Sequence, residues 1–444
     1  MIECNGFAPS VVNQENTIIM KKILITTATS LFVILSAIFL NSCLKDTCKR
    51  TYTYSYYIPV YKTTAEIKAD IKSGAPKEVG NPGKIVLLGN YIFLNEIDKG
   101  IHVIDNSNPA SPQNIAFITI PGNMDLALKG NTLYADLYTD LVTLDVSNPL
   151  NVVVKKYNEG VFPYRAYGNG FYGDTTKIIS EWIKKDTTVT ENCELGSRLV
   201  FNSYYMAGVS SSGQSSSNSN SNSPIGKGGS MARFAIVNTN LYTVSNTDLN
   251  VFSILNATDP VYKNKVNISS WDIETIFPFK DKLFIGSQNG MFVYNINNPD
   301  KPALIGQFSH VQSCDPVIAD DDFAYVTLRT GSACFGNANQ LEILQLNSFT
   351  NPTLVKAYPF TNPHGLSKDG NILFVCDGVG GLKIYNSSNV SNLQLIKQFS
   401  GLETYDVIAY NHIALVVAKD GLYQYDYADV NNIHLVSKIG ILNK

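Results

Sequence analysis

Two similar stretches of the chain decide its fold. Residues 100–109 read Gly-Ile-His-Val-Ile-Asp-Asn-Ser-Asn-Pro, and residues 141–149 read Leu-Val-Thr-Leu-Asp-Val-Ser-Asn-Pro. In each, an apolar run ends at an acidic residue and passes into a turn rich in Asn and Pro, which predicts a β-strand followed by a tight turn. The two acidic residues, Asp105 and Asp145, lie 40 residues apart. A unit that recurs at this spacing indicates a repeat protein.

The same unit continues towards the C-terminus. Five further copies close at Asn256, Asn295, Asn347, Asn386 and Asp426, and the last interval is again 40 residues. Seven units of about 40 residues, each with a few short strands, predict an all-β fold, a β-propeller of seven blades. Radial stacking buries both faces of sheets that could not be buried singly. A β-sandwich array or a solenoid is the alternative.

The two stretches resemble the LVIVD-repeat family. The resemblance covers most of residues 80–440 and is strongest in the first two repeats, because Asp becomes Asn at the later positions 256, 295 and 386. Members of that family are predicted propellers, and many are Bacteroidota lipoproteins without assigned activity. The resemblance therefore implies a propeller attached to a bacterial envelope membrane.

The N-terminal segment has the character of an export signal. Met20-Lys21-Lys22 is basic, residues 23–40 are nearly uncharged and apolar, and the segment ends in Leu40-Asn41-Ser42-Cys43. This pattern predicts a secretory signal. Its end resembles the bacterial lipobox, in which Cys43 would receive the lipid, whereas a plain transmembrane anchor is the alternative. Residues 1–19 read as an upstream extension, so residues 1–42 are expected to be absent from the mature protein.

The rest of the chain divides into a lead-in and the propeller. The lead-in, residues 43–80, holds a Tyr-rich stretch at 51–62. This stretch is expected to be an edge strand that pairs with an outer blade, with sugar stacking as the alternative role. A short helix is predicted over Thr63–Ser73, opened by a capping box. The propeller is expected over residues 81–444, with an insertion at 157–229 that is rich in Ser and Asn at 210–223.

The cysteines are consistent with an exported protein, in which disulfides are allowed. A Cys314–Cys334 disulfide would hold the inserted loop of the fifth repeat, and Cys48 with Cys193 is the alternative pair. Cys376 lies within an apolar strand and is expected to be a small core residue.

One polar position recurs at the start of each repeat, about nine or ten residues before the apolar residues of the strand pair. If the innermost strand of each blade lines the central channel, these side chains would form a ring. They could bind a cation such as Ca²⁺ through carboxylates, bind a polar ligand, or act as acid and base. The alternative is that they pair with each other and with backbone groups. The ring residues are Lys84, Asp125, Arg233, Glu274, Asp315, His364 and Asp406, with Arg329 as a secondary candidate.

The composition narrows the function to a class. The chain has 34 Lys and Arg against 37 Asp and Glu, for a formal charge of −3, which argues against nucleic-acid binding. The sequence favours a binding or scaffold module at the bacterial outer membrane, periplasmic or surface-exposed. An envelope protein or a glycan is the expected partner, and no cofactor beyond a possible role for Ca²⁺ is indicated. A hydrolase or lyase acting on a glycan or lactone at the channel is the alternative, and a purely structural envelope protein is a third.

Overall fold

The computed structural model describes Thr27 and residues 49–163, 177–192, 223–268, 273–310, 312–313, 316–331 and 338–440. The chain divides into two compact units. One unit comprises Met1–Ile58 and Ile183–Asn202, and the other comprises Pro59–Trp182 and Ser203–Lys444. The second unit holds the repeats.

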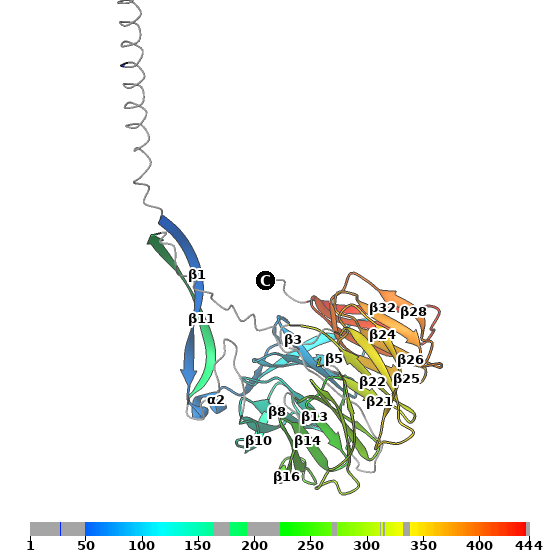
Figure 1. Cartoon of the computed structure of the whole chain (residues 1–444). Coiled ribbons are helices and arrows are strands. Elements are labelled where there is room, and N and C mark those ends of the chain that lie inside the picture. Colours follow the sequence, from blue (N-terminus) through cyan, green and yellow to red (C-terminus); the bar gives the residue numbers. More distant parts are fainter. Residues whose placement is uncertain are drawn as a thin grey trace, which may run out of the picture. The chain divides into compact units, whose positions relative to one another are not determined.

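The repeats form a seven-bladed β-propeller (Figure 1), which confirms the predicted fold. Each blade consists of four antiparallel strands that follow one another in the sequence. The first strands of successive blades contact each other, so they are the innermost strands. Blade 1 consists of β3 Pro82–Leu88, β4 Tyr91–Glu96, β5 Gly100–Asp105 and β6 Gln113–Thr119, and blade 2 of β7 Leu126–Lys129, β8 Thr132–Leu137, β9 Asp140–Asp145 and β10 Val153–Asn158. Blade 3 consists of β13 Phe234–Val237, β14 Asn240–Val244, β15 Asp248–Ser253 and β16 Val261–Asn267, blade 4 of β17 Ile273–Phe279, β18 Lys282–Ser287, β19 Gly290–Asn295 and β20 Ala303–Ser309, and blade 5 of β21 Val317–Ala319, β22 Phe323–Leu328, β23 Gln340–Gln345 and β24 Thr353–Pro359. Blade 6 consists of β25 Leu366–Asp369, β26 Ile372–Cys376, β27 Leu382–Asn386 and β28 Gln394–Phe399, and blade 7 of β29 Thr404–Tyr410, β30 Ile413–Ala418, β31 Gly421–Asp426 and β32 His434–Gly440.

The core of the propeller lies between the blades. Each pair of neighbouring blades shares a cluster of buried apolar side chains. Between blades 2 and 3, for example, Tyr134 and Leu141 pack with Phe234 and Phe252. The inner three strands are almost fully buried in most blades, whereas the outer strand is mainly exposed or half-buried. Stacking therefore buries both faces of each sheet.

The ring closes by side-by-side packing of blades 1 and 7. Ile85 and Leu87 of blade 1 share an apolar cluster with Ile408 and Leu415 of blade 7. Polar contacts at the outside reinforce this closure, because the side-chain amides of Asn106 and Gln424 donate to each other at 3.0 and 2.7 Å. Over residues 82–119 and 404–440, which form these two blades, each blade takes its four strands from one continuous stretch of chain.

The lead-in to the propeller contains a helix and a short strand. Helix α2 (Thr64–Ala69) starts with the predicted capping box between Thr63 and Glu66. The helix is shorter than the predicted Thr63–Ser73. It ends at Asp70, because the following residues form strand β2 (Lys72–Gly74), which pairs with β6 as an additional outer strand of blade 1.

The sequence predicted that the Tyr-rich stretch pairs with an outer blade, and the observed pairing is a different one. The stretch forms strand β1 (Lys49–Lys62), which pairs with β11 (Ile178–Asn192) in a separate two-stranded sheet. Hydroxyl groups join the two strands, with Thr51 to Thr190 at 3.1 Å and Thr53 to Thr188 at 2.9 Å. The prediction failed because β11, the partner that the insertion supplies, offers matching side chains along most of the strand.

The cysteine predictions are tested only in part. Cys376 is fully buried and unpaired, which confirms its place in the core. Cys43, the proposed disulfide residues Cys314 and Cys334, and the alternative pair Cys48 and Cys193 lie outside the described residues. Within the described part of the chain, no helix is long and apolar enough to cross a membrane.

Candidate functional site

The predicted ring residues occupy equivalent places in the blades. Six of them lie at the beginning of an innermost strand or up to two residues before it, at the same end of the ring. The seventh, Asp315, lies outside the described residues. The six are Lys84 in β3, Asp125 before β7, Arg233 before β13, Glu274 in β17, His364 before β25 and Asp406 in β29.

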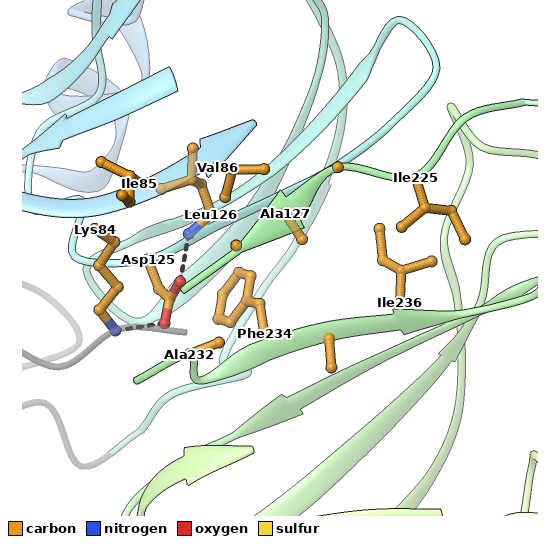
Figure 2. Close-up of a pocket in the computed structure, with 13 residues that line it drawn as sticks. Lys84, Ile85, Val86, Asp125, Leu126, Ala127, Ile225, Ala232, Phe234 and Ile236 are labelled. Atoms are coloured by element: carbon orange, nitrogen blue, oxygen red, sulfur yellow. Dashed lines mark hydrogen bonds and ion pairs between the residues drawn. The ribbon is translucent and has the colours of Figure 1, made fainter. Parts of the chain in front are cut away.

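Blades 1 to 3 form one closed sector of this ring (Figure 2). The Lys84 ammonium donates to Asp125 Oδ2 at 2.5 Å, and both side chains are almost fully buried. The backbone N–H of Arg233 donates to the same oxygen at 2.6 Å, and the N–H of Leu126 donates to Asp125 Oδ1 at 2.7 Å. Burial lowers the pKa of Lys84, although the nearby Asp125 carboxylate opposes that shift. Both oxygens of the Asp125 carboxylate therefore accept hydrogen bonds from neighbouring protein groups.

The carboxylate of Asp136 binds the backbone next to Asp125 and so supports this sector. Asp136 Oδ1 accepts from the backbone N–H groups of Met124 and Asp125, each at 2.8 Å, and from the side-chain amide of Asn123 at 2.9 Å. Asn123 in turn accepts from the amide of Asn95 in blade 1 at 2.6 Å. The polar groups of blades 1 and 2 thus hold one another in place.

The centre of the ring is filled by the chain itself. Residues 223–233, which we call the channel plug, include strand β12 (Lys227–Gly228), and this strand pairs with Val86 and Leu87 of the innermost strand β3. The N–H of Gly226 donates to the carbonyl of Leu128 in blade 2 at 2.9 Å. The sheet of blade 1 therefore continues inward past its first strand.

The plug also contacts blades on the far side of the ring. Lys227 Nζ donates to the carbonyl of Ala409 in blade 7 at 2.7 Å. Ser230 Oγ accepts from the N–H of Leu366 in blade 6 at 2.7 Å, and the carbonyl of Ala232 accepts from Ile276 in blade 4. Because one segment bonds to blades 1, 2, 4, 6 and 7, it must cross the channel.

Sequence reasoning missed the plug because it assigned residues up to 229 to the insertion at 157–229. A signal was present in Gly226-Lys227-Gly228-Gly229, a run without bulky side chains apart from one lysine. A Cβ atom at Gly226 would lie 2.5 Å from Val86 Cγ1, and one at Gly229 would overlap the Asp406 carboxylate. Only glycine fits where the plug passes so close to the ring.

The space left beside the plug is small. A cavity of about 20 Å³ lies among Lys84, Asp125, Ile225 and Phe234 (Figure 2). That volume holds about one water molecule. In the described part of the chain, no three His, Cys, Asp or Glu side chains gather to hold a metal ion. The cavity beside Lys84 and Asp125 is therefore about the size of one water molecule.

Blades 4 to 6 form a different sector. The secondary candidate Arg329 directly follows β22, and its Nε is buried without a hydrogen-bond partner among the described residues. Burial lowers the pKa of Arg329, while the Glu274 carboxylate opposes the shift. Burial, together with the Arg329 charge, lowers the pKa of His364 to about 3, so this imidazole is neutral at physiological pH.

These features define the class of protein: a seven-bladed β-propeller whose channel is filled by its own chain. Within this class, the sequence contains LVIVD repeats, because the model of that repeat family matches residues 79–116 and 122–157. These two matches cover most of blades 1 and 2, the same repeats in which the sequence resemblance is strongest.

Solved structures share the architecture at low sequence identity. A protein from Lactobacillus plantarum is 13% identical, with a TM-score of 0.51, and the match covers 81% of this chain and 98% of that one. The computationally designed protein Ika8 is 9% identical, with a TM-score of 0.49 and coverage of 82% and 90%. BamB from Moraxella catarrhalis is 6% identical, with a TM-score of 0.46 and coverage of 83% and 97%. No curated protein matches this chain. The first of these likenesses supports the fold and says nothing about activity.

Proposed function

We propose that the protein is a lipid-anchored binding or scaffold module of the bacterial outer membrane. The observation that carries this proposal is the channel plug. In a propeller, a ligand or substrate can be held at the central channel, but here residues 223–233 cross it. Recognition would then use the outer surfaces of the blades and the separate sheet of β1 and β11, which suits a macromolecular partner.

The chemistry of the ring supports the same proposal. Catalysis by general acid and base needs titratable groups that can reach a substrate. Lys84 and Asp125 instead bond to each other, and Asp125 also binds two backbone N–H groups. Their role is then to hold blades 1 to 3 together.

The membrane anchor is proposed from the sequence. The basic start, the apolar residues 23–40 and the Leu-Asn-Ser-Cys end support lipidation of Cys43. Metabolic labelling with an alkyne fatty acid tests this. The wild type and a Cys48→Ser control are expected to carry the label, and Cys43→Ser to lose it. Label that persists in Cys43→Ser would sink the anchor proposal.

Crosslinked affinity purification from native membranes tests the binding role. The tagged, lipidated protein is expected to recover one dominant envelope protein, or a covalently captured glycan, in near-stoichiometric amount. A matched sample without crosslinker controls for loss during washing. Clean recovery of the protein alone under both conditions would contradict the scaffold role.

A further inference from the structure

The outer edges of the seven blades differ in charge. The fourth strand of each blade lies at its outer edge, and an edge strand presents backbone N–H and C=O groups that can pair with another strand. Five of the seven outer strands carry one or two lysines, which oppose such pairing: β10, β16, β24, β28 and β32. The two outer strands whose sequences contain no charged residue are β6 and β20.

The chain covers one of these two uncharged edges itself. Strand β2 pairs antiparallel with the last three residues of β6, with Ser73 opposite Ile118. This pairing lies beyond the β-bulge that β6 makes at Ile115. Under the added strand, Phe117 and Ile118 are only 2% and 0% exposed. A bulge in an outer strand therefore does not prevent strand addition in this protein.

Strand β20 of blade 4 has the same geometry as β6 but lacks the added strand. Among the described residues, its sheet ends at β20. The β20 bulge lies at Ile305, so Gln307–Ser309 are the equivalents of Phe117–Thr119 in the register with the third strand. Gln307 and Ser309 are exposed and Phe308 is half-buried. The outer edge of β20 is therefore neutral, partly apolar and accessible.

We propose that β20 pairs antiparallel with β20 of a second copy of this chain, in a two-fold dimer. A partner of different sequence could offer acidic residues to a lysine-bearing edge, whereas a second copy would bring like charges together. Within the described part of the chain, β20 is the outer strand that has no covering strand and can meet its own copy without this repulsion. Such a two-fold interface closes at two copies. The proposal does not rest on the scaffold role.

The other blades supply the substitution that tests this proposal. Lys265 in blade 3 and Lys438 in blade 7 occupy the position that Gln307 has in blade 4, so the fold accepts a lysine there. Gln307→Lys is expected to weaken the dimer about tenfold, because the two-fold axis introduces the lysine twice at the shared edge. Gln398→Lys is the matched control: it adds the same charge at the equivalent position of β28, which already carries Lys397, and should associate like the wild type.

Sedimentation equilibrium of the purified full chain measures the association. In a detergent whose density the solvent matches, the measured mass is that of the protein alone. Over a concentration series, the wild type and Gln398→Lys are expected to pass from one copy to two, and Gln307→Lys to do so only at higher concentration. A wild type that stays at one copy, association that continues beyond two copies, or equal association of Gln307→Lys and wild type would overturn the proposal.

Hydrogen–deuterium exchange of the wild type alone locates the interface without any variant. Backbone N–H groups that bond to a partner strand exchange slowly. A peptide covering residues 303–309 is therefore expected to exchange more slowly in the dimer than in dilute protein, whereas a peptide covering residues 394–399 of β28 should exchange equally in both. Unchanged exchange of residues 303–309 on dimerisation would contradict an interface at β20.

Discussion

In five of the seven blades, the Asp or Asn that ends the third strand supplies one oxygen atom to the turn that follows; these residues are Asp105, Asp145, Asn295, Asn386 and Asp426. Asp105 Oδ1 accepts from the N–H of Ser107 at 2.8 Å, and Asn295 Oδ1 accepts from the N–H of Asn297 at 2.7 Å. Asp426 and Asn386 make the same bond two residues ahead, at 2.8 and 2.9 Å. Both residue types supply the oxygen, so a change from Asp to Asn weakens the sequence match without changing the turn.

This equivalence predicts the effect of substitutions at Asp426. Asp426→Asn keeps the acceptor for the N–H of Ala428 and should leave stability nearly unchanged. Asp426→Ala removes it and should lower the free energy of unfolding by about 1 kcal/mol. Urea unfolding of both variants checks this. Equal losses for Asn and Ala would show that the oxygen is not what matters.

Glu96 makes stability depend on pH. Burial opposes its ionisation, but hydrogen bonds from His102, Lys99 and the backbone of Gly80 and Asn81 hold its pKa at about 2. The pKa of Glu96 is lower in the folded state than in the unfolded state, where it is near 4.5. Its contribution to the free energy of unfolding is therefore complete above pH 4.5 and is lost as the pH falls towards about 2.

Unfolding measured between pH 5 and pH 2 tests this assignment. The wild type should lose on the order of 3 kcal/mol through Glu96 over that window, and Glu96→Gln should lose less. Because other carboxylates titrate in the same range, the difference between the two proteins is the quantity to compare. Parallel pH profiles would contradict the role given to Glu96.

Among the elements, the strands were predictable and the plug was not. Strand pairs such as β4 and β5 can be predicted from apolar runs between polar turns. Glycine is required at position 100 because a Cβ atom there would collide with the carbonyl of Ile118. Only two residues of the plug form a strand, and one more forms an isolated bridge, which is too few for any periodicity. The Tyr-rich strand was recognised, but the residues it contacts in its partner strand lie 120 to 139 residues away, so the pairing could not be predicted.

The plug predicts that its glycines are intolerant of side chains. Gly229→Ala would press a methyl group against Asp406, a carboxylate that is 1% exposed and also abuts Gly365. We expect a loss of about 1–3 kcal/mol in the free energy of unfolding. Gly440→Ala, where a Cβ meets nothing within 4 Å, is the control. Equal stability of the two variants would mean that the plug does not pass where the structure places it.

At the scale of the whole molecule, the position of the candidate site was predictable but its chemistry was not. Aligning the repeats placed Lys84, Asp125 and His364 at one end of the ring, because equivalent positions in a repeat become equivalent positions in space. Which charges pair depends on neighbours from other blades. The pairing of Lys84 with Asp125 emerges only once the blades are packed.

Closure of the ring is predicted to rest partly on the reciprocal amide pair of Asn106 and Gln424. A double-mutant cycle with alanine at both positions should show a coupling energy of about 1 kcal/mol. Asn106→Ala combined with Gln398→Ala, whose amide bonds within blade 6, should be additive. Absence of coupling between Asn106 and Gln424 would show that blades 1 and 7 are held by apolar packing alone.

The central claim is that residues 223–233 fill the channel, so that a partner must be recognised on the outside of the ring. Hydrogen–deuterium exchange of the native protein, followed in a peptide covering those residues, tests this most directly. The N–H of Gly226 is bonded inside the ring, so slow exchange comparable to that of β3 is expected. Exchange of the whole peptide at the rate of an unstructured chain would show an open channel and would contradict the account.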